Sequence, residues 1–125
     1  LTMASLIQAE AAGKSDMYNV SSVLHNRLRD GAAHGTPMLQ FDSTVYYPYA
    51  SASQAPAGFS STYNTYKITG LPAGPICNPG SDAIQAVLHP NSTSYYYFCH
   101  SASGVPYYAS TLAEHERNLV LAGLK

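Results

Sequence analysis

The sequence contains little charge: only 10% of its 125 residues are Asp, Glu, Lys or Arg, and the net charge is −1. It has no basic cluster, which argues against nucleic acid or an anionic lipid surface as a partner. No apolar run approaches the roughly 20 residues that a membrane-spanning helix needs. A single globular domain over residues 1–125 is therefore the expectation.

Cysteine is scarce as well, with only Cys77 and Cys99. They form no C-x-x-C pair, and no histidine spacing completes a zinc site, so we expect neither a metal nor a cofactor. Two free buried thiols and one disulfide are both compatible with the spacing, and the disulfide would close a loop of about 20 residues. A signal peptide is also missing and the chain begins at Leu1, so we expect an excised domain whose anchor or targeting segment lies outside it.

Helical patterns occur near both ends of the chain. Three of the expected helices begin at residues that can cap a helix N-terminus, Asp16, Ser81 and Thr111, and the helices end at glycine or before proline. Thr111 with Glu114 three residues later forms a capping box for the last of them. The four expected helices are Thr2–Ala12, Asp16–Arg29 (with Asp16 as its cap), Ser81–Leu88 and Thr111–Gly123.

Strand patterns lie between these helices. A hairpin is predicted from Ser94–Cys99 and Val105–Ala109, joined by a turn at Ser101–Gly104. Residues 31–79 are rich in Gly, Pro, Ser and Ala and are expected to be mostly loop, with short strand-like pieces at Ser43–Tyr47 and Tyr66–Thr69. This order predicts an α+β fold in which terminal helices pack around a small antiparallel sheet, with a loop-rich centre.

Glu10 is the candidate catalytic acid. At about 100° per residue it falls inside the apolar arc of the first helix, between Leu6 and Met3. A carboxyl among apolar side chains is favoured in its neutral form, which is what protonation of a glycosidic oxygen requires. The alternative is an ordinary surface glutamate on a helix whose buried face lies elsewhere.

Polar side chains in the centre of the chain are candidate substrate ligands. Alternation along an extended strand would place Gln40, Asp42 and Thr44 on one face, where they could bind sugar hydroxyls and amides or simply form a solvated edge. Further candidates are Asn26, Tyr63, Asn64 and Tyr66. Arg27 falls within the apolar arc of the second helix, so we expect it to form a structural ion pair.

Taken in order, several segments resemble the YceG-like family of endolytic murein transglycosylases. They are Leu1–Glu10, Asn26-Arg27-Leu28, Leu39–Tyr46, Tyr63–Ile76, Asn78-Pro79-Gly80, His89-Pro90, Tyr95–Phe98 and Thr111–His115. The resemblance runs over nearly all the chain. This chain departs from the family pattern at Ser43, where the family usually has proline, in the Ser- and Ala-rich segment between Tyr46 and Tyr63, and at its two cysteines.

The resemblance implies a catalytic role for Glu10. Members of this family cut the MurNAc-β-1,4-GlcNAc bond inside peptidoglycan strands without water and leave 1,6-anhydro-MurNAc ends. The resemblance also implies a place in the cell envelope outside the cytoplasm, with an N-terminal anchor in the cytoplasmic membrane and a LysM-like module, neither of which lies in these residues. Cell-wall synthases are further expected partners.

Two other functions remain open at this stage. A lysozyme-like hydrolase would cut the same polymer with water and would ordinarily use two carboxylates, whereas no second acid lies near Glu10 in the sequence. A non-catalytic glycan-binding module would account for eleven Tyr against three Phe, because tyrosine offers an apolar face and a hydroxyl to sugars. Such a module has no need of a buried glutamate.

Overall fold

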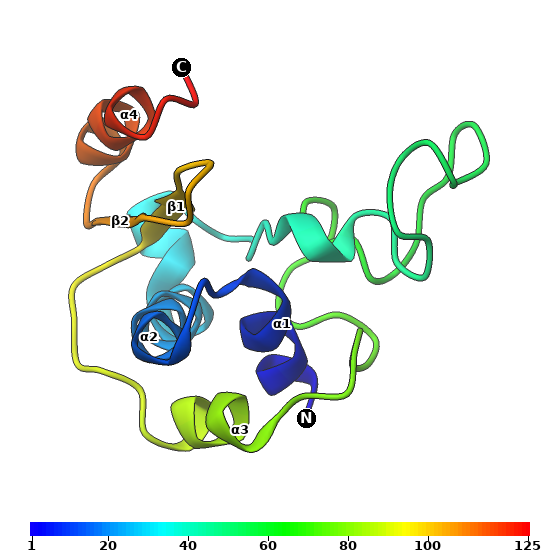
Figure 1. Ribbon diagram of the computed structural model, residues 1–125, viewed down its shortest axis with the longest axis horizontal. Coiled ribbons are helices and arrows are strands. Elements are labelled where there is room, and N and C mark those ends of the chain that lie inside the picture. The colour runs from blue at the N-terminus through cyan, green and yellow to red at the C-terminus, as the bar shows by residue number, and fades with distance from the viewer.

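The computed structural model describes residues 1–125, and helices dominate it (Figure 1). The predicted α+β class is confirmed. The elements, in chain order, are α1 (Thr2–Glu10), α2 (Lys14–Asp30), the short 3₁₀ helices η1 (Gly31–His34) and η2 (Asp42–Thr44), α3 (Ser81–Leu88), β1 (Tyr97–His100), β2 (Pro106–Ala109) and α4 (Leu112–Leu121).

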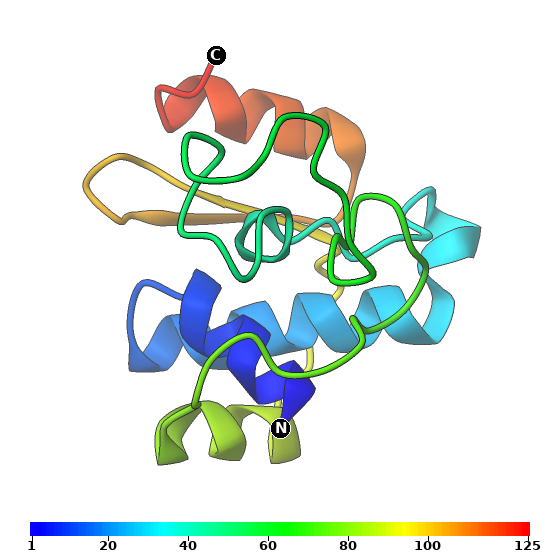
Figure 2. The same cartoon turned by 90° about the vertical axis from the view of Figure 1, so that its right-hand side faces the viewer.

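The hydrophobic core lies where α1, α2 and α3 pack against one another. α1 crosses α2, and α3 lies beneath both (Figure 2). Leu6, Ile7 and Leu24 are fully buried there, together with Phe41 from the central segment. Each such side chain stabilises the fold by about 2 kcal/mol relative to exposure. The core therefore holds the C-terminal end of α1, where Glu10 lies, in a defined position.

The predicted hairpin is present with shorter strands. β1 and β2 pair antiparallel, with Tyr97 opposite Ala109 and Cys99 opposite Tyr107. The turn at Ser101–Gly104 closes through a bond from the Gly104 N–H to the Ser101 carbonyl (2.9 Å). Gly104 has φ +87°, a conformation that favours glycine. The hairpin lies between the helical core and α4 (Figure 1).

The predicted N-terminus of the last helix is confirmed. The Thr111 hydroxyl accepts the Glu114 N–H (3.2 Å) and caps α4. None of the residues of α4 is fully buried, and the helix rests on the hairpin as a cover rather than as part of the core. α4 therefore forms one wall of the space above β1.

Four local predictions were wrong. Ser81 does not cap α3, because Gly80 occupies the N-cap and Ser81 is the first residue of the helix. Ser43–Tyr47 and Tyr66–Thr69 are not strands but a 3₁₀ turn and irregular turns, and residues 45–62 extend away from the body (green, Figure 1). Asp16 does not cap α2, because Gly13 occupies the N-cap and Asp16 lies in the first turn with its side chain directed elsewhere. For the two strands and Asp16, a long-range contact replaces the local pattern that supported the prediction.

Candidate active site

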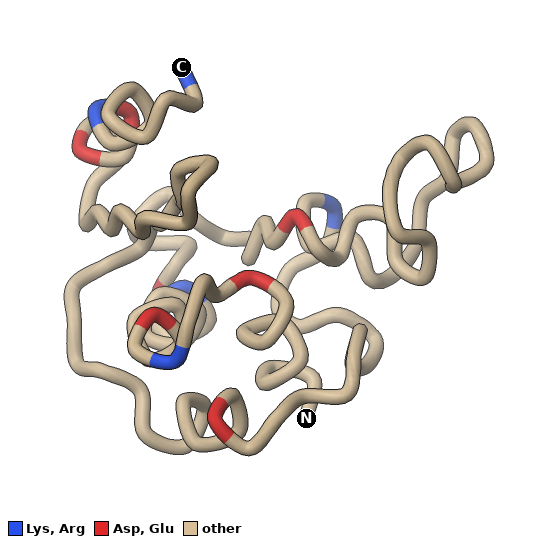
Figure 3. Tube along the Cα trace, in the orientation of Figure 1, with Lys and Arg blue, Asp and Glu red and all other residues tan.

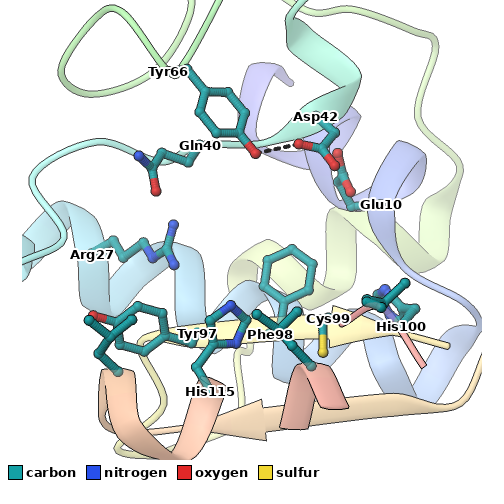
Figure 4. Close-up of a pocket in the computed structure, with 13 residues that line it drawn as sticks. Glu10, Arg27, Gln40, Asp42, Tyr66, Tyr97, Phe98, Cys99, His100 and His115 are labelled. Atoms are coloured by element: carbon teal, nitrogen blue, oxygen red, sulfur yellow. Dashed lines mark hydrogen bonds between the residues drawn. The ribbon is translucent and has the colours of Figure 1, made fainter. Parts of the chain in front are cut away.

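One cavity of about 550 Å³ lies between the end of α1, the segment around η2, the hairpin and α4 (Figure 4). It brings together residues from six separate parts of the chain. They are Glu10, Arg27, Gln40, Asp42, Tyr66, Tyr97, Phe98, Cys99, His100, Leu112, His115, Leu119 and Leu124. Lysine and arginine are few and dispersed along the chain (Figure 3), and Arg27 is the one that lines this cavity.

Glu10 is the last residue of α1, one turn after the buried residues Leu6 and Ile7. Its side chain is half-buried and lines the cavity. One carboxylate oxygen, Oε1, accepts the backbone N–H of Ser43 at 2.9 Å. Glu10 therefore has a fixed orientation, with part of its carboxyl group accessible to a ligand.

Two buried threonines position the backbone that contacts Glu10. The Thr65 hydroxyl accepts the Phe41 N–H (2.8 Å) and pairs with the Thr44 hydroxyl (2.8 Å). The Thr44 hydroxyl donates to the Phe41 carbonyl (2.7 Å) and accepts the Thr65 N–H (3.0 Å). These bonds join the chain at residues 41–44 to residue 65, and so determine where the Ser43 N–H lies.

Replacing Thr65 by Val is expected to lower the free energy of unfolding by about 2 kcal/mol. Valine fills the same space but leaves the buried Phe41 N–H without a partner. Because Ser43 would shift relative to Glu10, any catalytic rate should fall as well. Urea unfolding measures the stability, and Thr69→Val, at an exposed threonine, is the matched control. Equal stability of the two variants would show that the threonine pair does not organise this segment.

Asp42 and Tyr66 form the second polar pair in the cavity. The Tyr66 hydroxyl donates to Asp42 Oδ1 (Figure 4). Burial, together with this hydrogen bond, raises the pKa of Tyr66 above its ordinary value, so the phenol remains a neutral donor at physiological pH. Gln40 adjoins this pair with φ +56°, which breaks the extended alternation that the sequence suggested. Gln40, Asp42 and Tyr66 thus reach the cavity, as turn residues rather than as strand residues.

Two of the central candidates do not reach the cavity. Thr44 is fully buried within the threonine pair described above, because η2 turns its side chain into the core. Asn64 is also buried, and its Oδ1 accepts the Tyr66 N–H (2.9 Å) within a local turn. Both residues shape the backbone beneath the cavity and are not available to a ligand there.

Asn26 and Tyr63 likewise lie outside the cavity. The Asn26 amide is buried and donates to the carbonyls of Thr93 (3.1 Å) and Tyr95 (2.8 Å), so it attaches α2 to the segment before β1. The Tyr63 ring packs against Tyr47, with centroids 4.6 Å apart. These contacts depend on residues distant in the sequence, so no local pattern could place either side chain.

The ion pair expected for Arg27 is absent. Its guanidinium instead donates to two backbone carbonyls, from Nε to Tyr96 (2.6 Å) and from Nη1 to Leu39 (2.5 Å). It lies over the Tyr97 ring at 5.5 Å from the centroid. Burial lowers the pKa of Arg27 from its ordinary value, although an arginine remains charged. The position of Arg27 inside the apolar arc indicated from the sequence that its side chain would be buried. The sequence could not show that no carboxylate would lie beside it.

Asp16 is a buried acid next to the cavity. The sequence had indicated a role for it only as a helix cap. Its Oδ2 accepts the Ala12 N–H (2.8 Å) and lies 2.6 Å from His100 Nε2, while Oδ1 accepts the Tyr108 hydroxyl. His100 lines the cavity and Ala12 follows Glu10 by two residues. Asp16 therefore joins the turn after Glu10 to both strands of the hairpin.

The two cysteines are free thiols. Cys99 is buried in β1 beside the cavity, whereas Cys77 is exposed and donates to the Ser5 carbonyl (3.3 Å). Partial burial raises the pKa of both thiols. The disulfide alternative is therefore wrong. The alternative of two free thiols is correct, but only Cys99 is buried as expected, because Cys77 is exposed.

Fold and site together define a small α+β domain built around a cleft that contains two acidic side chains, one arginine and two tyrosines. The chain belongs to the YceG-like family, whose model matches residues 1–120.

Named relatives agree with this membership. The chain is 40% identical over 121 residues to an endolytic murein transglycosylase of Bacillus subtilis (strain 168), covering 94% of this chain and 32% of that protein. It is 30% identical over 129 residues to one from Streptococcus pneumoniae (serotype 2, strain D39), covering 95% of this chain and 22% of that protein. The chain thus spans less than a third of either relative.

A solved structure has the same fold. The crystal structure of a yceG-like protein from Listeria monocytogenes superimposes with a TM-score of 0.76 at 36% identity. The match covers 94% of this chain and 38% of that one.

Proposed function

We propose that this domain is the catalytic part of an endolytic peptidoglycan lytic transglycosylase. The observation that carries the proposal is Glu10, a half-buried carboxyl held by the Ser43 N–H and lining the cleft of about 550 Å³. The names of the relatives support the substrate class. The cleaved bond would be MurNAc-β-1,4-GlcNAc.

In the proposed mechanism, Glu10 acts first as an acid and then as a base. Its proton goes to the glycosidic oxygen as the C1–O bond breaks, and the GlcNAc end leaves as an alcohol. The carboxylate then accepts the proton of the C6 hydroxyl of the same muramic acid, whose O6 bonds to C1. The product is a 1,6-anhydro ring, and no water is consumed. Because the nucleophile is tethered to the reacting sugar, proximity replaces a positioned water.

A lysozyme-like hydrolase is the second candidate, because the fold places Asp42 in the cleft with Glu10. Glycosidases that use water or a covalent intermediate usually have two catalytic carboxylates in one cleft. However, Asp42 Oδ1 is already bonded to the Tyr66 hydroxyl, which weakens Asp42 as a base or nucleophile. We therefore favour the intramolecular route and assign Asp42 to substrate binding.

Product mass separates these two reactions. Digestion of purified sacculi is expected to yield fragments whose muramic acid ends are lighter by one water than hydrolysed ends. Mass spectrometry of the soluble products measures this difference directly, with a lysozyme digest of the same sacculi as the reference. Reducing ends alone would overturn the transglycosylase route and favour hydrolysis with Asp42.

Gln40, Asp42 and Tyr66 are the proposed substrate ligands within the cleft. Their amide, carboxylate and phenol groups suit the hydroxyl and N-acetyl groups of amino sugars. A glycan-binding module without catalysis would use the same residues. It would show saturable binding of glycan strands with no product.

We also propose that the whole protein acts at the cell envelope, outside the cytoplasm. Peptidoglycan strands would be its substrate and cell-wall synthases its partners, with a membrane anchor outside these residues. Within residues 1–125, no helix has both the length and the apolar character required to span a membrane. Nucleic acid, metal and cofactor have no part in the proposed reaction.

A further inference from the structure

Arg27 is a largely buried cation in the cleft with no carboxylate beside it. Its two hydrogen bonds go to the backbone carbonyls of Tyr96 and Leu39. Buried charges in proteins are normally paired, because desolvation of a lone ion is costly. Backbone carbonyls satisfy some N–H groups but do not neutralise the charge, so the site retains an attraction for an anion.

The guanidinium also has N–H groups that make no hydrogen bond within the domain. Arginine carries five N–H groups in a planar fork, and the two carbonyls use one on Nε and one on Nη1. The remaining three are on Nη1 and Nη2. Figure 4 shows the guanidinium above the Tyr97 ring and turned toward Gln40 across the open part of the cleft. A carboxylate entering there would meet donors in the geometry that arginine offers to carboxylates.

His115 completes this end of the cleft. Its ring stacks on the Tyr97 ring, with centroids 5.0 Å apart, and its Nδ1 is buried without a hydrogen-bond partner. Burial lowers the pKa of His115, and the charge of Arg27 lowers it further, so the ring is neutral at physiological pH. Because Nδ1 is buried, the nitrogen available to a ligand is Nε2, which donates one hydrogen bond in the neutral tautomer that carries its proton there.

We propose that Arg27 and His115 form a subsite for a carboxylate of the substrate, across the cleft from Glu10 and Asp42. This inference rests on the proposed function, because the ligand is a peptidoglycan strand. Two sources supply such a group: the lactyl carboxylate of a muramic acid without peptide, or a carboxylate of the attached peptide stem. Because the subsite lies at the opposite end of the cleft from Glu10 and Asp42, a carboxylate bound there would also determine the direction in which a strand lies.

Binding of three oligosaccharides of equal length tests the subsite. One is a neutral GlcNAc oligomer, one contains MurNAc with free lactyl carboxylates, and one carries peptide stems. In the Glu10→Gln protein, which prevents turnover, at least one carboxylate ligand is expected to bind about tenfold to a hundredfold more tightly than the neutral oligomer. The preferred ligand identifies the source, and the preference should shrink at high salt.

Substitutions of single residues test whether Arg27 and His115 cause the preference for carboxylate ligands. Arg27→Gln should abolish the preference, and Arg117→Gln, which removes an exposed charge outside the cleft, should leave it unchanged. His115→Phe keeps the stacking on Tyr97 but removes the ring nitrogens, and is expected to weaken carboxylate binding alone. It serves as the second variant if Arg27→Gln does not fold.

The two proposals fail in different ways. Cleavage of glycan strands with equal or tighter binding of the neutral oligomer would overturn the subsite and leave the proposed function standing. A wild-type protein that neither binds nor cleaves any glycan would overturn the proposed function itself.

Discussion

Glu10→Gln is expected to lower the rate of glycan-strand cleavage by about 10²- to 10⁴-fold, the usual contribution of a general acid–base. Glutamine cannot donate the proton that the glycosidic oxygen needs. It has the same size as glutamate, and its carbonyl oxygen can still accept the Ser43 N–H. The fold should therefore be retained, with an unchanged melting temperature. Release of soluble fragments from sacculi measures the rate.

The matched control is Glu116→Gln, an exposed glutamate on α4 outside the cleft. It makes the same chemical change and should leave the rate unaltered. If Glu10→Gln turned over substrate as fast as the wild type, Glu10 would not be the acid, and Asp42 would be the remaining carboxyl in the cleft.

Asp16→Ala is expected to lower the free energy of unfolding by about 3 kcal/mol. The change leaves the Ala12 N–H, the Tyr108 hydroxyl and the His100 imidazole without their common partner. Removing one member of a buried polar cluster lowers stability, because its former partners stay buried without a hydrogen bond. Thermal and urea unfolding measure the loss. Cleavage should slow too, because the turn after Glu10 loses its attachment to the hairpin.

Asp82→Ala is the comparison for this prediction. Asp82 lies on the surface and faces Lys14 at 3.7 Å, with 53% of its side chain exposed. Exposed pairs of this kind contribute little, so its removal should change stability by less than about 0.5 kcal/mol. Equal effects at the two positions would show that the Asp16 cluster does not hold the hairpin to α2.

The sequence by itself determined the helices, the hairpin and the position of Glu10. The cap of α4 depends on residues three apart, Thr111 and Glu114, so a local pattern sufficed to predict it. The apolar arc of α1 likewise predicted a Glu10 side chain among buried neighbours, and that side chain is partly buried. The ordered motifs then indicated the family, which is confirmed.

The cleft itself was decided only by the tertiary structure. Glu10 and Ser43 are 33 positions apart, and Asp16 and His100 are 84 apart. No local periodicity records such contacts. For this reason Asp42 could not be placed beside Glu10 from the sequence, and Arg27 could not be recognised as a buried cation without a carboxylate partner. A residue's preference for helix or turn depends on its neighbours in the sequence. The solvation and hydrogen-bond partners of its side chain are established only when distant segments pack together.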